Sequence, residues 1–255
     1  MKIVSWNIAG GHLMTSNVKD AIGYEEENLD YFIQHLKKIN PDIICLQETH
    51  ISKDEKLNQT KEIAQAFDYK YFSTHIYEGR ESHIKPGHFL SFGTISRFPI
   101  VSNKYWNPPN PRLTVKRPNG IIWETLDMGI YVSQINFQKR IINVANTHLL
   151  PLHYYKKDWS DKEFQHLRNF VSNLFLSIKE EPTIAIGDFN YADLIKIYPG
   201  IFSLGKYQDV FIQDTTPTKG QQDHILFSQH WSLKKAEVID RVDADHYICI
   251  AELKL

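Results

Sequence analysis

The sequence predicts an α/β fold, and within that class a sandwich of sheets rather than a strict β-α-β repeat. Many short β-like runs are bounded by turn residues, and helical segments lie between hairpins instead of after every strand. No glycine-rich loop of the Walker or dinucleotide-binding type is present. We therefore expect an α/β sandwich without either of these phosphate-binding loops.

The first part of the chain is expected to contain strands and two helices. Apolar side chains recur at helical spacing through residues 25–39. Asn40-Pro41 ends this helix, because the residue before a proline is pushed out of the α region. The expected elements are strand 2–8, helix 25–39, strand 43–46, helix 53–67, and strands 69–77 and 88–96.

The second part is expected to contain a hairpin, one long helix and further strands. Residues 160–179 carry the strongest helical pattern, and Ser160 with Glu163 three residues later predicts a capping box at its start. Residues 130–135 and 141–147 are expected to pair as an antiparallel hairpin with a turn near 137–140. The remaining predicted strands are 183–186, 223–227, 235–239 and 247–253.

The composition is that of an ordinary globular protein, with 42% hydrophobic and 23% charged residues, and we expect one domain over residues 1–255. No run of about 18 apolar residues exists, so no membrane insertion is expected. The N-terminal MKIVSW does not resemble a secretory signal. Cys45 and Cys249 lie in apolar β-like runs and are expected to be buried, reduced thiols. We expect a cytoplasmic monomer.

A net charge of −1 argues against a protein that coats nucleic acid through bulk positive charge. Residues 102–122 are a local exception and fit either a proline-rich surface loop or a contact surface for phosphates and bases. Residues 149–159 fit either a mobile aromatic surface loop or a surface that stacks on bases and contacts phosphates. The basic and aromatic residues of these segments are Lys104, Tyr105, Trp106, Arg112, Lys116, Arg117, His153, Tyr154, Tyr155, Lys156, Lys157 and Trp159.

Polar side chains repeatedly mark the ends of apolar strands. Each of these residues, taken singly, could have a purely structural role. Asp188, for example, could simply form an Asx-turn. Strand ends at one rim of a sheet converge in space, so the joint pattern predicts a single site. The residues after strands are Asn7, Glu48, His148, Asp188 and Asn190, and those before strands are Asp223, His224, Asp245 and His246.

These residue types suit phosphoryl chemistry. Hard oxygen ligands favour Mg²⁺ or Mn²⁺, and no thiolate cluster for zinc is present. Histidines beside carboxylates can carry protons or stay charged against a phosphate. A metal, an activated water and positive groups around the developing charge are the parts that such a reaction needs.

The same residues resemble an ordered family signature. The resemblance is to the endonuclease/exonuclease/phosphatase superfamily, and it extends from residue 3 to about residue 250. It implies a four-layer α/β/β/α sandwich of two mostly antiparallel sheets, like deoxyribonuclease I, with the site at one rim and Mg²⁺ as cofactor, Mn²⁺ being possible. The matching motifs are Trp6-Asn7, Gln47-Glu48, Gly93–Ile100, Thr147-His148, Gly187-Asp188-Phe189-Asn190, Asp223 and Asp245-His246.

The resemblance implies a metal site and a water site. Glu48 would be the principal Mg²⁺ ligand, with Asn7 and Asp245 close to the metal or its waters. Asp188 would orient or deprotonate the attacking water, and Asn190 would steady that group and the phosphate.

The resemblance also implies roles for the histidines. His246 would hydrogen-bond the phosphate, Asp223 would orient its ring, and His148 would be a second phosphate contact or proton carrier. Whether Asp188 or His246 is the general base stays open. Two departures from the family pattern leave every catalytic group in place: His224 follows Asp223 where many members have tyrosine, and alanine precedes Asp245 where serine is usual.

Three functions fit this sequence. The first is a phosphodiesterase acting on nucleic acid or a nucleic-acid adduct. The second is a phosphoesterase of small-molecule, inositol phosphate or lipid headgroup substrates, although no long apolar loop suggests insertion into a bilayer. The third is a non-enzymatic binding module on this fold, which would predict the loss of a core group, and none is lost.

Overall fold

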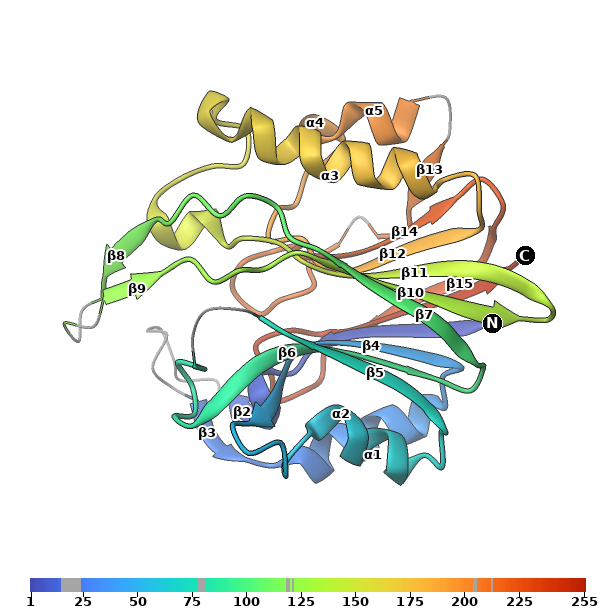
Figure 1. The fold of residues 1–255 in the computed structure, drawn as a ribbon, viewed down its shortest axis with the longest axis horizontal. Helices are drawn as coiled ribbons and strands as arrows, with labels where there is room; N and C mark the ends of the chain where they lie inside the picture. Colours follow the sequence, from blue (N-terminus) through green and yellow to red (C-terminus); the bar gives the residue numbers. More distant parts are fainter. Residues whose placement is uncertain (15–23, 78–80, 118–119, 121, 204–205, 212) are drawn as a thin grey trace.

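Two six-stranded sheets lie face to face, and helices cover both outer faces (Figure 1). The computed structural model describes residues 1–14, 24–77, 81–117, 120, 122–203, 206–211 and 213–255. Within those ranges the layers run helix, sheet, sheet, helix, which confirms the predicted α/β sandwich of two mostly antiparallel sheets.

The first sheet lies against α1 (Leu29–Ile39) and α2 (Gln59–Ala66), at the bottom of Figure 1. Its one parallel pair is β1 with β4, and its other neighbours are antiparallel. In spatial order its strands are β15 (Ser232–Ile239), β16 (Ile248–Lys254), β1 (Lys2–Asn7), β4 (Ile43–Ser52), β6 (His88–Ser96) and β5 (Tyr71–Ile76).

The second sheet repeats this plan under α3 (Gln165–Ile178), α4 (Leu194–Ile197) and α5 (Pro199–Phe202). Its parallel pair is β11 with β12. In spatial order its strands are β13 (Tyr207–Asp209), β14 (Asp223–Ser228), β12 (Thr183–Asp188), β11 (Arg140–His148), β10 (Ile130–Phe137) and β7 (Ile100–Trp106).

Several short elements lie at one end of the sandwich (Figure 1). Two short ribbons project there, at the left of Figure 1. They are β2 (His12–Met14) with β3 (Tyr24–Glu27), and β8 (Thr114–Lys116) with β9 (Ile122–Glu124). Three 3-10 turns complete the described elements: η1 (Ala9–Gly11), η2 (Leu152–Tyr155) and η3 (Lys162–Phe164).

The central strands are apolar on both faces because both faces are covered. In β4, Ile43 and Cys45 pack between the sheets, whereas Ile44 and Leu46 pack toward the helices. Cys249 on β16 belongs to the same core between the sheets, so both cysteines are buried thiols, as predicted. Side chains on a strand alternate between faces, which explains why these strands are continuous apolar runs in the sequence.

The predicted hairpin is confirmed as β10 and β11. The strands pair from Ile130 with Thr147 to Phe137 with Arg140. Gln138 and Lys139 form the turn with φ values of 52° and 67°. Two successive positive φ values match the right-handed twist of a hairpin.

Three helix boundaries were wrong, and three strands that include residues of the 102–122 segment were not predicted. The helix predicted at 25–39 begins at Leu29, because β3 occupies 24–27 and the Asn28 side chain caps the helix by accepting from the Tyr31 N–H. The helix predicted at 53–67 begins at Gln59, because β4 continues to Ser52.

The capping box predicted at Ser160 does not form, and the helix predicted at 160–179 begins at Gln165, after the 3-10 turn η3. The Ser160 N–H donates to Asp158, and the Glu163 carboxylate binds Lys157 instead of the helix start. Part of the 102–122 loop is strand, namely the end of β7, all of β8 and the start of β9. The sequence did not predict β7, because it is a polar edge strand without an alternating apolar pattern.

No helix in the described ranges is both long enough and apolar enough to cross a membrane.

Gly187→Ala is expected to lower the free energy of unfolding by about 1–3 kcal/mol. Gly187 has a φ of 138°, and an added Cβ would lie 2.1 Å from the Thr147 carbonyl oxygen. Chemical denaturation measures the change. Gly200→Ala is the matched control, since nothing lies within 4 Å of a Cβ there. Equal stabilities of the two variants would contradict this reading of the backbone.

Candidate active site

The eight predicted site residues meet at one end of the sandwich. Strand register explains this: Asn7 pairs with Gln47 next to Glu48, His148 pairs with Asp188, and Asp188 pairs with Asp223. Seven of the eight line one pocket of about 420 Å³, and Asp223 lies behind it against His246. The seven are Asn7, Glu48, His148, Asp188, Asn190, Asp245 and His246.

Glu48 is aimed into the pocket by a break in the β4–β6 register between Leu46 and Thr49. Its φ is 56°, and its N–H donates to the Tyr77 hydroxyl over 3.2 Å. Bulges of this kind redirect a side chain out of the regular alternation. The carboxylate therefore faces the other sheet instead of following its strand.

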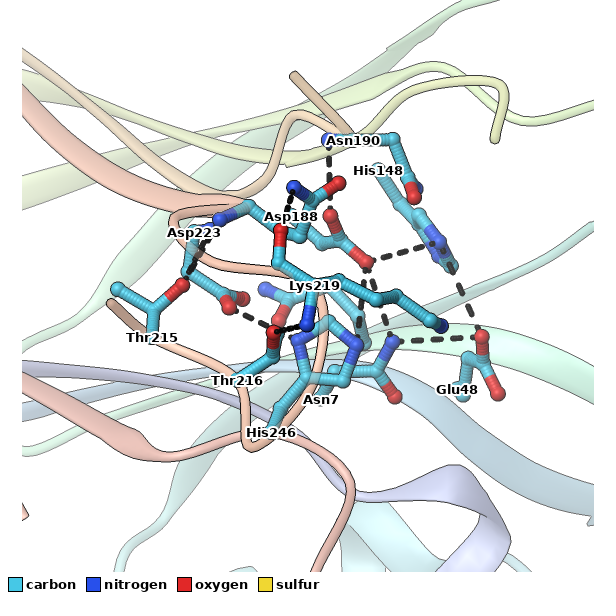
Figure 2. A network of polar contacts seen from close by, with 12 residues as sticks. Asn7, Glu48, His148, Asp188, Asn190, Thr215, Thr216, Lys219, Asp223 and His246 are labelled. Carbon is cyan, nitrogen blue, oxygen red and sulfur yellow. Dashed lines mark hydrogen bonds and ion pairs between the residues drawn. The ribbon is translucent and has the colours of Figure 1, made fainter. Parts of the chain in front are cut away.

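Asp188 is the centre of the polar network (Figure 2). Its Oδ2 lies 3.4 Å from Asn7 Nδ2, 3.5 Å from His148 Nε2 and 3.6 Å from His246 Nε2. Its Oδ1 accepts from the Asn190 N–H over 2.8 Å. One carboxylate thus joins residues from both sheets.

Two amides support this carboxylate. Asn7 Nδ2 lies 3.3 Å from Glu48 Oε1, while Asn7 Oδ1 accepts from the Ala9 N–H. Asn190 has a φ of 52°, and its Nδ2 donates to the Leu149 carbonyl. Asn7 therefore bridges the Glu48 and Asp188 carboxylates, and Asn190 is held by its own turn.

His246 is charged at neutral pH. Its Nδ1 lies 2.8 Å from Asp223 Oδ2. Burial alone would lower the pKa of His246, but the carboxylates of Asp223 and Asp188 raise it to about 10. A buried imidazolium therefore points its Nε2 toward Asp188.

His148 is neutral at the same pH. Burial and the nearby positive charge of His246 lower the pKa of His148 to about 3. Its Nδ1 lies 2.9 Å from the Tyr77 hydroxyl, whose oxygen already accepts from the Glu48 N–H. The Tyr77 O–H is thus free to donate to Nδ1, which places the ring proton of His148 on Nε2, facing Asp188 and Glu48.

The buried carboxylates fit a cation. Burial raises the pKa of Asp188 to about 6, and burial together with Asp245 raises the pKa of Glu48 to about 7. Among the described residues no lysine or arginine lies within 4.0 Å of the Glu48 carboxylate. The nearby basic side chain is His148, whose Nε2 lies 3.8 Å from Glu48 Oε1 and which is neutral. Oxygen donors whose negative charge is not neutralised match the ligand set of Mg²⁺ or Mn²⁺.

A second group of possible metal ligands is more compact. Ligand atoms of Asp188, Asp223 and His246 lie within 4.8 Å of one another. The hydrogen bond between Asp223 and His246 already uses Nδ1 of that histidine, so this group is better explained as a charge-paired triad than as an ion site.

Sequence reasoning missed Tyr77, Thr215 and Lys219. Thr215 Oγ1 accepts from the Asp223 N–H over 2.9 Å and anchors the start of β14. Lys219 follows on the same loop and lines the pocket. No periodicity marks these residues, and only their position shortly before Asp223 could have drawn attention to the last two.

The 149–159 segment borders the pocket only in part. Tyr154 and Tyr155 line it, which favours the contact-surface alternative for them. Trp159 does not: it is buried in the core under α3 and donates to the Leu150 carbonyl. Lys157 pairs with Glu163 away from the pocket lining.

The basic 102–122 segment is also divided. Arg117 Cζ lies 4.2 Å from the Trp123 ring centroid, beside the pocket. Lys104 instead stacks on Trp106, and neither of these two lines the pocket.

His224 points away from the pocket. Neighbouring side chains on a strand face opposite sides, so Asp223 faces the site while His224 is buried behind it. His224 Nδ1 lies 2.5 Å from Asp209 Oδ2, and its Nε2 lies 2.9 Å from the Tyr191 carbonyl oxygen. His224, which replaces the tyrosine of many family members, thus contacts the turn that follows Asp188 and Asn190.

Several solved structures share this fold. An endonuclease/exonuclease/phosphatase from Beutenbergia cavernae DSM 12333 has a TM-score of 0.68 at 16% identity, covering 100% of this chain and 71% of that one. Mannosyl-6-phosphatase Bt3783 of Bacteroides thetaiotaomicron VPI-5482 has a TM-score of 0.63 at 16% identity, covering 100% of both chains. A humanized D. rerio TDP2 with 14 mutations has a TM-score of 0.61 at 16% identity, covering 100% of this chain and 99% of that one.

No curated protein matches the sequence. At 16% identity the structural likeness shows the fold alone. The sequence model of the endonuclease/exonuclease/phosphatase family, however, matches residues 4–246, nearly the whole chain and every predicted site residue. The chain belongs to the endonuclease/exonuclease/phosphatase family.

Proposed function

We propose that the protein is a Mg²⁺-dependent phosphoester hydrolase that cleaves a phosphodiester of nucleic acid or of a nucleic-acid adduct by attack of water. The observation that carries this proposal is the pairing of Asp188 with His246 across 3.6 Å, beside the Glu48 carboxylate. A buried carboxylate and a buried imidazolium in one pocket offer a proton acceptor and a fixed positive charge to the same phosphate.

Glu48 would hold the metal, with Asn7 and Asp245 beside it; all three line the pocket. A bound Mg²⁺ supplies Lewis acidity and positive charge to the phosphate. Mn²⁺ is the alternative ion for the same oxygen ligands. The neutral amide of Asn7 separates Glu48 from Asp188, so that one carboxylate is left for the metal and the other for water.

The protonation states favour Asp188 as the general base. His246, with its pKa raised by Asp223 and Asp188 to about 10, already carries its proton at pH 7 and so donates from Nε2 to a phosphoryl oxygen. Asp188, with a pKa raised by burial to about 6, is ionised at pH 7 and accepts a proton from water. Asp223 holds the His246 ring through Nδ1.

His148 and Asn190 complete the pocket from the second sheet. Neutral His148 presents an N–H toward the carboxylates, which suits a hydrogen bond to a phosphoryl oxygen. Asn190 lies between Asp188 and the Leu149 carbonyl and steadies the base.

A small-molecule phosphoester is the second candidate substrate. The pocket volume of about 420 Å³ lies within the range of small-ligand sites, about 300–1,000 Å³. One structural neighbour is named a mannosyl-6-phosphatase. A non-enzymatic binding module is disfavoured, because all eight predicted groups are present and converge.

Glu48→Ala is expected to abolish metal-dependent turnover without unfolding the protein. The assay compares about 5 mM Mg²⁺, an excess for a water-rich site, with EDTA on oligonucleotides, a 5′-phosphotyrosyl oligonucleotide and sugar or inositol phosphates. Glu62→Ala on the exposed face of α2 is the matched control and should keep full activity. Retention of Mg²⁺-dependent activity by Glu48→Ala would refute the metal assignment.

Mg²⁺ should raise the midpoint of thermal unfolding more at pH 8 than at pH 5.5. Burial and Asp245 raise the pKa of Glu48 to about 7, so below pH 7 a cation must displace a proton. Apparent affinity should fall about tenfold per pH unit for each displaced proton. Glu48→Gln cannot titrate at this position and should lose most of the Mg²⁺ effect. Equal Mg²⁺-induced shifts at both pH values in the unmodified protein would argue against this site.

His246→Ala is expected to lower kcat by about 10²–10⁴-fold, the range for loss of a general acid–base group. The variant removes the buried cation that faces Asp188 and the phosphate. Steady-state kinetics on the best substrate measure the effect, with exposed His166→Ala as the control. A near-normal rate in His246→Ala would remove this residue from the mechanism.

A further inference from the structure

One side of the pocket is an aromatic and apolar wall that the proposed chemistry does not use. Trp123 from β9 and Tyr154 from η2 meet with ring centroids 6.0 Å apart and planes at 81°. Both rings line the same pocket as Asp188 and His246. The wall continues through Tyr155, Ile122, Leu126 and Met128. Ile122 is 64% exposed, so this end of the pocket opens to solvent.

Two cations lie over these rings. Arg117 Cζ is 4.2 Å from the Trp123 centroid and 5.5 Å from the Tyr154 centroid. Lys219 Nζ is 4.6 Å from the Tyr154 centroid and also hydrogen-bonds the Tyr154 hydroxyl. Such stacking holds a cation in place without neutralising its charge.

The charge balance of the wall favours an anion. Within the described ranges, no carboxylate lies within the 4.0 Å of an ion pair from Arg117 or Lys219. Glu81 and Glu124, two acids of the pocket lining outside the predicted catalytic group, are paired with Lys53 and Arg112, respectively. These two carboxylates are thus balanced by partners outside the pocket lining, whereas Lys219 lines the pocket and Arg117 stacks beside it.

Lys219 connects the wall to the catalytic groups. Its N–H donates to Thr216 Oγ1 in a tight loop, and Thr215 of the same loop holds the Asp223 N–H. Figure 2 shows the Lys219 side chain extending across the pocket in front of Asp188. An ammonium group in this place can contact a phosphate that lies between the wall and the catalytic carboxylates.

The pocket has room for one nucleotide but not for a duplex. Its volume of about 420 Å³ suits a small ligand. Specific duplex binding needs about 1,000–2,500 Å² of protein surface. The flat rings offer a stacking surface for a base, and the polar Ser82, His83 and Glu81 in the same lining disfavour an acyl chain.

We propose that Trp123, Tyr154 and Lys219 form a nucleotide subsite, in which the rings contact the base and Lys219 contacts the phosphate. This inference rests on the proposed function and narrows its substrate to a small nucleotide ester or the terminal nucleotide of a single strand. The Arg117 guanidinium stacks on both the Trp123 ring and the Tyr154 ring, and so helps to fix the position of the Trp123 ring.

The test is calorimetric titration of adenosine 5′-monophosphate and of ribose 5-phosphate, which lacks the base. Both are titrated with Mg²⁺ into the His246→Ala protein, so that turnover does not consume the ligand. We expect the nucleotide to bind about 5- to 150-fold more tightly, the range for one stacked base. Equal affinities for the two ligands would overturn the proposal without any further variant.

Two substitutions separate the base contact from the phosphate contact. Trp123→Ala should weaken the nucleotide by the same factor and leave ribose 5-phosphate unchanged. Lys219→Met should weaken both ligands equally. Lys104→Met, which removes the cation stacked on Trp106 outside the pocket, is the matched control. Equal weakening of both ligands by Trp123→Ala would overturn the base contact, and an unchanged phosphate affinity in Lys219→Met would overturn the phosphate contact.

The proposed function and the subsite can fail separately. Base-dependent binding without Mg²⁺-dependent hydrolysis would support the subsite and overturn the proposed function. Mg²⁺-dependent hydrolysis with equal affinity for the two ligands would support the proposed function and overturn the subsite.

Discussion

The buried carboxylate of Asp188 is the constraint around which the rest of this molecule is organised. An ionised group in this position is costly unless partners surround it. Asn7 from the first sheet, His148 from the second sheet, and His246 from the loop before β16 all approach its Oδ2 within 3.6 Å. The two sheets must therefore pack in a single register for the carboxylate to be satisfied.

Backbone irregularities occur where this register meets the site. Glu48 adopts a positive φ at a bulge, Asn190 adopts a positive φ after Asp188, and Gly187 leaves room for the Thr147 carbonyl. Regular strands would send these side chains to alternate faces. Local strain of this kind is typical of functional sites, where the surrounding fold enforces a conformation that the chain does not prefer.

The two histidines show how the surroundings decide chemistry. Both rings are buried and both lie within 3.6 Å of Asp188 Oδ2. The Asp223 and Asp188 carboxylates raise the pKa of His246, whereas burial and the charge of His246 lower the pKa of His148. One ring is consequently a fixed cation and the other a neutral donor. The aromatic wall adds two further basic side chains, Arg117 and Lys219, which stack on the rings of Trp123 and Tyr154.

The sequence by itself determined the fold class, most strands and the eight polar residues that meet in the pocket, because apolar alternation and polar strand ends are local patterns. It missed the edge strand β7 and the β8–β9 ribbon, whose exposed polar residues carry no such pattern. Only the tertiary structure decided that Tyr77 sets the tautomer of His148, that Trp159 is core, and that Trp123 and Lys219 face the catalytic groups. These contacts join segments far apart in the chain, and their energies depend on burial and distance, which no local pattern encodes.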